Sequence, residues 1–331
     1  MASPPQLRST PIDPTLVTAF TGYERVGLDG VLTGAPYRLH RAIGRGSLLE
    51  FAYGWRFADQ WSGVWWPQGI AVGDYNGAPL ALVSAYAKQD RHGNQQGARI
   101  SVIDLRDAAH PAYRHVLLVS PRRTESGVVL DPVLIHAGGI AWMGDRLLVA
   151  ATFDGIREFR LSDIRRVPRG SEIFGYDFVL PEFSHHEPAD SSLQGRMRYS
   201  FITVETGSAI RSDASSAKLV AGEYARDDSH RLARVTQSGD QTVVEQSFIP
   251  GIVHMQGAAL HNGTWYVSSS HGENRGGDLW SGPIDALRKR DRVLPPGPEA
   301  LAVWPERNQL WSVSEVPGRR WIYGIDLARL T

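Results

Sequence analysis

Pro67-Gln68-Gly69-Ile70-Ala71-Val72 is the stretch that decides the fold, because its pattern returns three more times along the chain. Each copy joins a polar residue and one or two small residues to a short apolar strand. The other copies are His136-Ala137-Gly138-Gly139-Ile140-Ala141-Trp142, Met255-Gln256-Gly257-Ala258-Ala259-Leu260 and Pro298-Glu299-Ala300-Leu301-Ala302-Val303. A repeat of this kind indicates a protein built from one recurring supersecondary unit.

A tight turn and a second strand follow each copy. The turns include Asn76-Gly77 and Asn262-Gly263, residues that tolerate the positive φ of hairpin turns. Second strands are expected at 80–86, 146–152, 265–270 and 309–314. Third strands then lead into Asp104, Asp163, Asp285 and Asp326, and each aspartate is expected to open the next turn by accepting a backbone hydrogen bond.

A fifth copy is degenerate, with strands expected at 199–205, 218–224, 230–236 and 242–249. Small residues suit inner strands that crowd around a central axis, as in four-stranded meanders arranged radially. The chain has 34 Gly and 20 Pro and no long helical period, which argues against a helical fold. The sequence therefore predicts an all-β fold, a single five-bladed β-propeller.

The last copy stops after its third strand, near Leu330. We expect the N-terminal region, at 37–43 or 48–53, to supply the missing outer strand and close the ring. The alternative is a sixth, irregular blade within residues 20–60. On either interpretation, residues 1–20 form an extended N-terminal segment and residues 21–331 form the propeller domain.

Composition excludes several classes of partner and site. The 331 residues carry zero net charge, so no overall field attracts nucleic acid or an anionic membrane. The absence of cysteine excludes disulfides and thiolate chemistry, and no window approaches the ~20 apolar residues of a membrane span. The Ala2–Gln6 stretch resembles a mature exported N-terminus, so we expect a secreted monomer, with a cytoplasmic protein as the alternative.

From Trp65 to Leu330 the repeats resemble the β-propeller superfamily, in particular bacterial YncE/NHL-like and lactonase-like propellers. Five-bladed glycosidases of the arabinanase type are a further comparison, and they carry acidic residues where several inner strands begin. The positions matched to these here are Gln68, His136, Gln256 and Glu299, so a second acid would have to come from a loop. No cofactor is firmly implied, and a divalent cation such as calcium in the channel is left open.

The loops between blades and those between second and third strands share one face of a propeller, where a pocket is expected. His136 and Glu299 are the predicted acid–base pair, with His254 and His271 as alternates. The predicted ligand contacts on this face are Trp65, Trp66, Gln68, Tyr86, Phe153, Glu223, Gln256, Glu273 and Arg275. The competing interpretation is structural, since buried polar side chains there can simply tie neighbouring strands together.

Residues 181–196 contain His185-His186-Glu187 and are interpreted as a loop that covers the site as a lid. Neighbouring histidines in an extended chain point to opposite sides, which disfavours their binding one metal ion. Because the repeats differ at the matched positions, one asymmetric site is expected. The sequence predicts an acid–base enzyme that processes a small molecule or glycan (hydrolase, lyase or cyclase) without a redox cofactor. The alternative is a non-catalytic propeller that binds a glycan or a protein.

Overall fold

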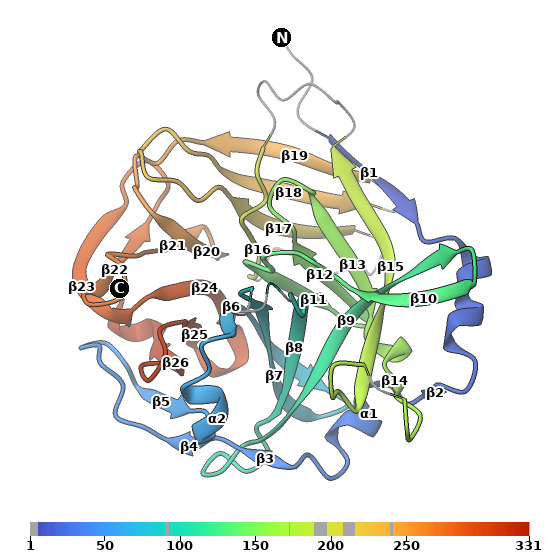
Figure 1. Ribbon diagram of the computed structural model, residues 1–331. Coiled ribbons are helices and arrows are strands. Elements are labelled where there is room, and N and C mark those ends of the chain that lie inside the picture. The colour runs from blue at the N-terminus through green and yellow to red at the C-terminus, as the bar shows by residue number, and fades with distance from the viewer. Residues whose placement is uncertain are drawn as a thin grey trace.

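The computed structural model describes residues 6–89, 93, 95–171, 173–188, 197–207, 216–238 and 241–330. Antiparallel meanders follow one another around a central axis, and the expected all-β propeller is confirmed (Figure 1). None of the helices in this part of the chain combines the length and apolar character that crossing a bilayer requires.

Four meanders follow each other directly in sequence. The first contains β6 (Trp65–Tyr75), β7 (Ala78–Ala87), β8 (Ala98–Asp104) and β9 (Ala112–Thr124). The second contains β11 (Ile140–Met143), β12 (Arg146–Ala150), β13 (Ile156–Arg160) and β15 (Phe178–Pro188). The degenerate copy forms β16 (Phe201–Val204), β17 (Ser216–Gly222), β18 (Leu232–Ser238) and β19 (Gln241–Phe248). The next is β20 (Met255–His261), β21 (Thr264–Ser269), β22 (Gly276–Gly282) and β23 (Arg288–Pro296).

The last meander joins the two ends of the chain. Its strands β24 (Pro298–Trp304), β25 (Gln309–Ser314) and β26 (Trp321–Asp326) are completed by β5 (Phe51–Gly54), which pairs antiparallel with β26. Closure by an N-terminal strand is thus confirmed, and the second of the two expected segments supplies it (Figure 1). The first segment forms β3 (Tyr37–Arg38), which pairs with β9, and β4 (His40–Arg41), which pairs with β5.

Short strands connect the outer edges of neighbouring meanders. β1 (Gln6–Pro11) pairs with both β15 and β19, β2 (Glu24–Arg25) pairs with β14 (Arg165–Arg166), and β10 (Gly127–Pro132) pairs with β9. These pairs and the parallel β15–β9 contact join three meanders into one 17-stranded sheet, so the blade count stays a prediction. So does the domain boundary at residue 20. The helical elements are α1 (Gly27–Leu32), α2 (Phe57–Gln60) and the 3₁₀ segments Pro14–Phe20, Leu161–Asp163, Pro305–Arg307 and Leu327–Arg329.

The predicted lid is wrong over residues 181–188, because these residues belong to β15 and are hydrogen-bonded into the sheet on both sides. His186 is buried with its Nε2 2.9 Å from Glu158, whereas His185 turns to the other side and contacts Glu187. The alternation of a strand therefore separates the two histidines, as expected. The rest of the predicted lid, 189–196, lies outside the described residues.

The inner strands pack too closely for larger side chains. A Cβ on Gly139 would lie 2.4 Å from the Ile202 nitrogen, and one on Gly257 would lie 2.5 Å from the Ala300 Cα. Serine hydroxyls of the second strands tie consecutive meanders together, since Ser84 donates to the Ala137 carbonyl (2.8 Å) and Ser268 donates to the Glu299 carbonyl (2.8 Å). Close packing and these hydrogen bonds fix where each inner strand begins.

The aspartate turns form as expected at two positions. Asp104 Oδ1 accepts a hydrogen bond from the Arg106 nitrogen at 3.0 Å, and Asp326 Oδ1 accepts one from the Ala328 nitrogen at 2.9 Å. Both aspartates stand at the end of a third strand, so the turn chemistry read from the sequence is confirmed there.

Candidate functional site

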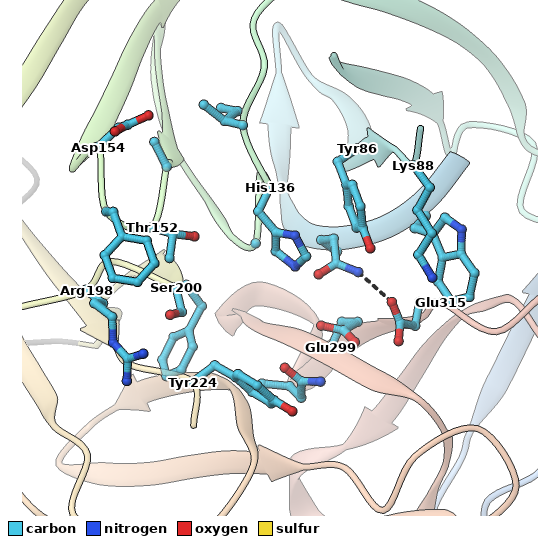
Figure 2. Close-up of a pocket in the computed structure, with 18 of the residues that line it drawn as sticks. Tyr86, Lys88, His136, Thr152, Asp154, Arg198, Ser200, Tyr224, Glu299 and Glu315 are labelled. Carbon is cyan, nitrogen blue, oxygen red and sulfur yellow. Dashed lines mark hydrogen bonds between the residues drawn. The ribbon is translucent and has the colours of Figure 1, made fainter. Parts of the chain in front are cut away.

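A cavity of about 670 Å³ opens where the inner strands begin. Side chains and backbone from every meander line it (Figure 2): Trp66, Gln68, Tyr86, Lys88, Leu134, Ile135, His136, Gly138, Ala151, Thr152, Phe153, Asp154, Arg198, Ser200, Phe201, Tyr224, Gln256, Glu273, Glu299 and Glu315. Its size is that of a small-molecule site.

Strand register shows which cavity residues occupy equivalent positions. The pairs Ile70–Val83, Ile140–Val149, Ile202–Ala221, Ala258–Val267 and Leu301–Ser312 mark the same point of each meander. Two residues earlier on each inner strand stand Gln68, Gly138, Ser200, Gln256 and Glu299, all of which line the cavity. The expected equivalence of His136 and Gln68 is therefore wrong, because Gly138 takes that position and His136 precedes it by two residues.

The second strands supply another layer. Three residues beyond the paired position of four second strands stand Tyr86, Thr152, Tyr224 and Glu315, and these also line the cavity. The equivalent residue of the fifth second strand, Ser270, is not part of the lining. Equivalent backbone positions thus carry chemically different side chains around the axis. Figure 2 shows Glu299, Glu315, Tyr86 and Lys88 on one side and Thr152, Arg198 and Ser200 on the other. The side chains of this cavity are arranged asymmetrically, as expected.

Two carboxyl groups dominate the first side. Glu299 is buried, and its Oε1 has no hydrogen-bond partner in the described part of the chain. Burial raises the pKa of Glu299 well above its ordinary value, and the neighbouring charge of Glu315 raises it further. Glu299 therefore keeps its proton at a pH where Glu315 is already ionised.

Glu315 has partners that favour its anion. Gln68 Nε2 donates to Glu315 Oε2 at 2.8 Å, the hydrogen bond drawn to Glu315 in Figure 2. The cations of Lys88 and Arg320 lie close enough to act on the charge of Glu315. Burial still raises the pKa of Glu315, because these interactions offset only part of the desolvation. The second acid that a two-carboxyl site needs thus comes from the residue directly after β25, in the same meander as Glu299.

Arg320 is a buried cation beneath this pair. Its Nε donates to the Glu315 carbonyl at 2.6 Å and its Nη1 donates to the Asp59 carbonyl at 2.9 Å. Burial lowers the pKa of Arg320 to about 10, and the charge of Arg99 adds to that effect. The Trp66 ring contacts both cations, with Lys88 Nζ 3.1 Å and Arg320 Cζ 5.4 Å from the ring centroid. These contacts fix the backbone of Glu315. They also keep the positive charges of Arg320 and Lys88 near the Glu315 carboxylate.

His136 faces the carboxyl pair across the cavity (Figure 2). Its ring lies 4.3 Å from that of Tyr86, centroid to centroid. Burial, with a smaller effect of Lys88, lowers the pKa of His136 to about 4. The imidazole is therefore neutral at pH 7. It can accept or donate a hydrogen bond, but it is not a general acid at that pH.

Of the remaining predicted site residues, Trp66, Gln68, Tyr86, Phe153, Gln256 and Glu273 line the cavity with His136 and Glu299. The other five do not line it. Trp65 packs against Arg99 and Tyr176, His254 stacks on Tyr224, His271 contacts Asp278 at 2.7 Å, Glu223 binds Arg231, and Arg275 is exposed. The roles assigned to the predicted residues stay predictions.

Sequence patterns did not mark several of the residues that line the cavity. Glu315 and Lys88 belong to loops expected on this face, but nothing marked them as facing Glu299 or Trp66. Arg198, Thr152 and Ser200 carry no motif, although Ser200 stands at the repeat position of the degenerate copy. Register alone could have found them. Among the described residues no group of three or more His, Cys, Asp or Glu side chains is placed to hold a metal ion. Calcium in the channel stays a prediction.

No protein-family model matches this chain, and no curated protein matches it either. Solved structures similar in fold include a gluconolactonase from Xanthomonas campestris (14% identity, 88% of this chain and 84% of that chain, TM-score 0.37). They also include a GH43_1 enzyme from Xanthomonas citri (10%, 81% and 88%, TM-score 0.41) and a glutaminyl cyclase from Myxococcus xanthus (13%, 78% and 89%, TM-score 0.39). Each likeness concerns the fold alone.

Proposed function

We propose that this chain is an enzyme that processes a glycan or a small molecule by acid–base chemistry in the 670 Å³ cavity. The observation that carries the proposal is the pair formed by buried Glu299 and half-buried Glu315 on one side of the cavity. Their environments raise the pKa of Glu299 further than that of Glu315, so that Glu299 holds a proton when Glu315 ionises. Pairs of this kind divide the roles of acid and base in hydrolases.

The reaction that fits this pair is hydrolysis of a bond to a leaving oxygen. Glu299 donates its proton to that oxygen as the bond to it breaks. The Glu315 carboxylate takes a proton from the attacking water, whose oxygen forms the new bond. Each event moves one proton, and no redox partner is needed. His136, neutral at pH 7, serves as a hydrogen-bond partner for the substrate rather than as the acid.

The remaining cavity side chains suit a substrate with both apolar faces and hydroxyl groups. Tyr86, Phe153 and Tyr224 present aromatic surface, on which sugar rings or aromatic groups stack. Gln68 and Gln256 add amide donors and acceptors at two equivalent positions of the inner ring. Secretion and a monomeric state stay predictions.

A screen with chromogenic substrates tests the proposal. The wild-type protein is expected to release para-nitrophenol from at least one member of a panel of para-nitrophenyl glycosides and esters. Its kcat/KM should be bell-shaped in pH, because the reaction needs one carboxyl protonated and the other ionised. Release no faster than by the Glu299→Gln/Glu315→Gln double variant for every member would contradict the proposal.

A binding protein without catalysis is the second candidate, supported by the aromatic lining and the absence of any ligand-specific motif. Calorimetry on the same panel separates the two. Binding of one or more members of the panel, with no member turned over, would favour this candidate and contradict the enzyme.

A further inference from the structure

We propose that the cavity binds a substrate that carries a carboxylate, held by Arg198 together with the hydroxyl groups of Thr152 and Ser200. The inference names the substrate class of the site and rests on the proposed function only for its location. Figure 2 places these three residues together, on the side of the cavity away from Glu299 and Glu315.

Arg198 lines the cavity and forms no ion pair with a carboxylate in the described part of the chain. In the described part of the chain its guanidinium has one hydrogen-bond partner, the His230 ring, at 3.0 Å from Nη2. Glu223 accepts from the Arg198 backbone nitrogen at 2.8 Å, but its carboxylate is bound by Arg231 Nη2 at 2.7 Å. The guanidinium carbon of Arg198 also lies over the Phe153 ring, 5.8 Å from its centroid. The remaining donors of a planar fork match a carboxylate.

The hydroxyl groups come from positions that the fold fixes firmly. Thr152 has φ +57°, which is a strained conformation for a β-branched residue. Two hydrogen bonds with Tyr199 maintain it, at 2.9 and 3.1 Å between the backbone nitrogens and carbonyls. Ser200 follows Tyr199 directly, so the same backbone pairing brings Thr152 and Ser200 to one wall. Strain held at a cavity wall indicates that the placement of Thr152 serves binding.

The charges of the cavity specify the anion and its orientation. One guanidinium balances one negative charge, which suits a carboxylate better than a phosphate dianion. The carboxyl groups of Glu315 and Glu273, which act on each other electrostatically, repel an anion on the opposite wall. Asp154 lies on the side of Arg198, as Figure 2 shows, and no ion pair joins the two in the described part of the chain. A substrate carboxylate therefore goes to Arg198, and the bond to be cleaved points towards Glu299. Among sugars, uronic acids carry such a group.

Calorimetry on the full chain tests the inference with D-glucuronate, D-galacturonate and the methyl ester of each. At least one acid is expected to bind about ten- to a hundredfold more tightly than its ester, the range for a charge-assisted hydrogen bond. The preference should weaken as salt is added. Arg198→Gln should abolish it, and Arg198→Lys should retain part, since lysine keeps the charge but loses the fork.

Arg226→Gln is the matched control, because Arg226 is exposed, lies outside the cavity lining and carries the same charge. It should leave the preference unchanged. Esters that bind as tightly as the acids, or an acid preference that survives Arg198→Gln, would overturn the inference. An acid preference without turnover of any substrate would leave it standing and contradict the proposed function. Turnover of neutral substrates with no acid preference would overturn the inference and leave the proposed function standing.

Discussion

Glu299→Gln is expected to lower kcat by about 10²- to 10⁴-fold, the contribution of a positioned general acid. The amide has nearly the shape of the protonated carboxyl but has no proton to give to the leaving oxygen. KM should change little, because the cavity keeps its form. The measurement is steady-state kinetics with the glycoside or ester that the wild-type protein turns over.

Relative to wild type, the Glu299→Gln variant should become more stable as the pH rises. In the unfolded chain Glu299 ionises near its ordinary pKa, whereas in the folded protein it keeps its proton to higher pH. Above that ordinary pKa the unfolded state binds fewer protons than the folded state, so folding stability falls with pH until the folded pKa is reached. Glu299→Gln removes this loss. Its Tm relative to wild type should be higher at pH 7 than at pH 4.

Glu125→Gln is the control for both measurements, because Glu125 is exposed in the turn between β9 and β10. It should change neither kcat nor the pH dependence of Tm. A Glu299→Gln protein with wild-type kcat would remove Glu299 from the proposed chemistry, whatever its stability.

Asp59→Asn is expected to cost about 3–5 kcal/mol of unfolding free energy, the range for breaking a buried charge network. Tyr113 Oη and Arg56 Nε donate to Asp59 at 2.7 and 2.8 Å, and His115 Nε2 lies 3.2 Å away. Burial opposes ionisation, but the contacts with His115 and the charge of Arg99 outweigh it and hold the pKa of Asp59 below its ordinary value. The asparagine leaves the buried Arg99 without its counter-charge.

Guanidinium denaturation of wild type and Asp59→Asn measures this difference in unfolding free energy. Asp131→Asn is the matched control, since it breaks an ion pair with Arg122 whose side chains are 60% and 42% exposed. Surface pairs of this kind contribute about 1 kcal/mol or less. Equal losses in the two variants would show that the Asp59 network does not stabilise the fold. Because Arg320 also binds the Asp59 carbonyl, the network supports the meander that carries Glu315.

The fold could be predicted because its determinants are local and repeated. Small residues at the inner strands, hairpin turns and terminal aspartates recur, and close packing around an axis explains them. Closure by β5 followed from the missing outer strand of the last copy. The lid was mispredicted because His185-His186-Glu187 is polar, yet one of its side chains is buried against Glu158.

The site was harder to predict, because it depends on register between strands far apart in sequence. His136 was matched to Gln68 because each is the first polar residue of its copy. The small residues Ala137-Gly138-Gly139 that follow allow two alignments of the copies, two residues apart, and the structure aligns Gly138 with Gln68. Glu315 faces Glu299 only because β24 and β25 pair as they do. Arg320 lies in no repeated pattern, and its position under Glu315 follows from a turn whose backbone it binds.

Infrared spectroscopy of the folded protein at pH 7 tests the central claim most directly, namely that Glu299 holds a proton beside an ionised Glu315. The difference spectrum of wild type minus Glu299→Gln should contain the C=O stretch of one protonated carboxylic acid, and wild type minus Glu315→Gln should contain the bands of a carboxylate. A carboxylate signal in the Glu299 difference would contradict the account, because an ionised Glu299 has no proton to donate.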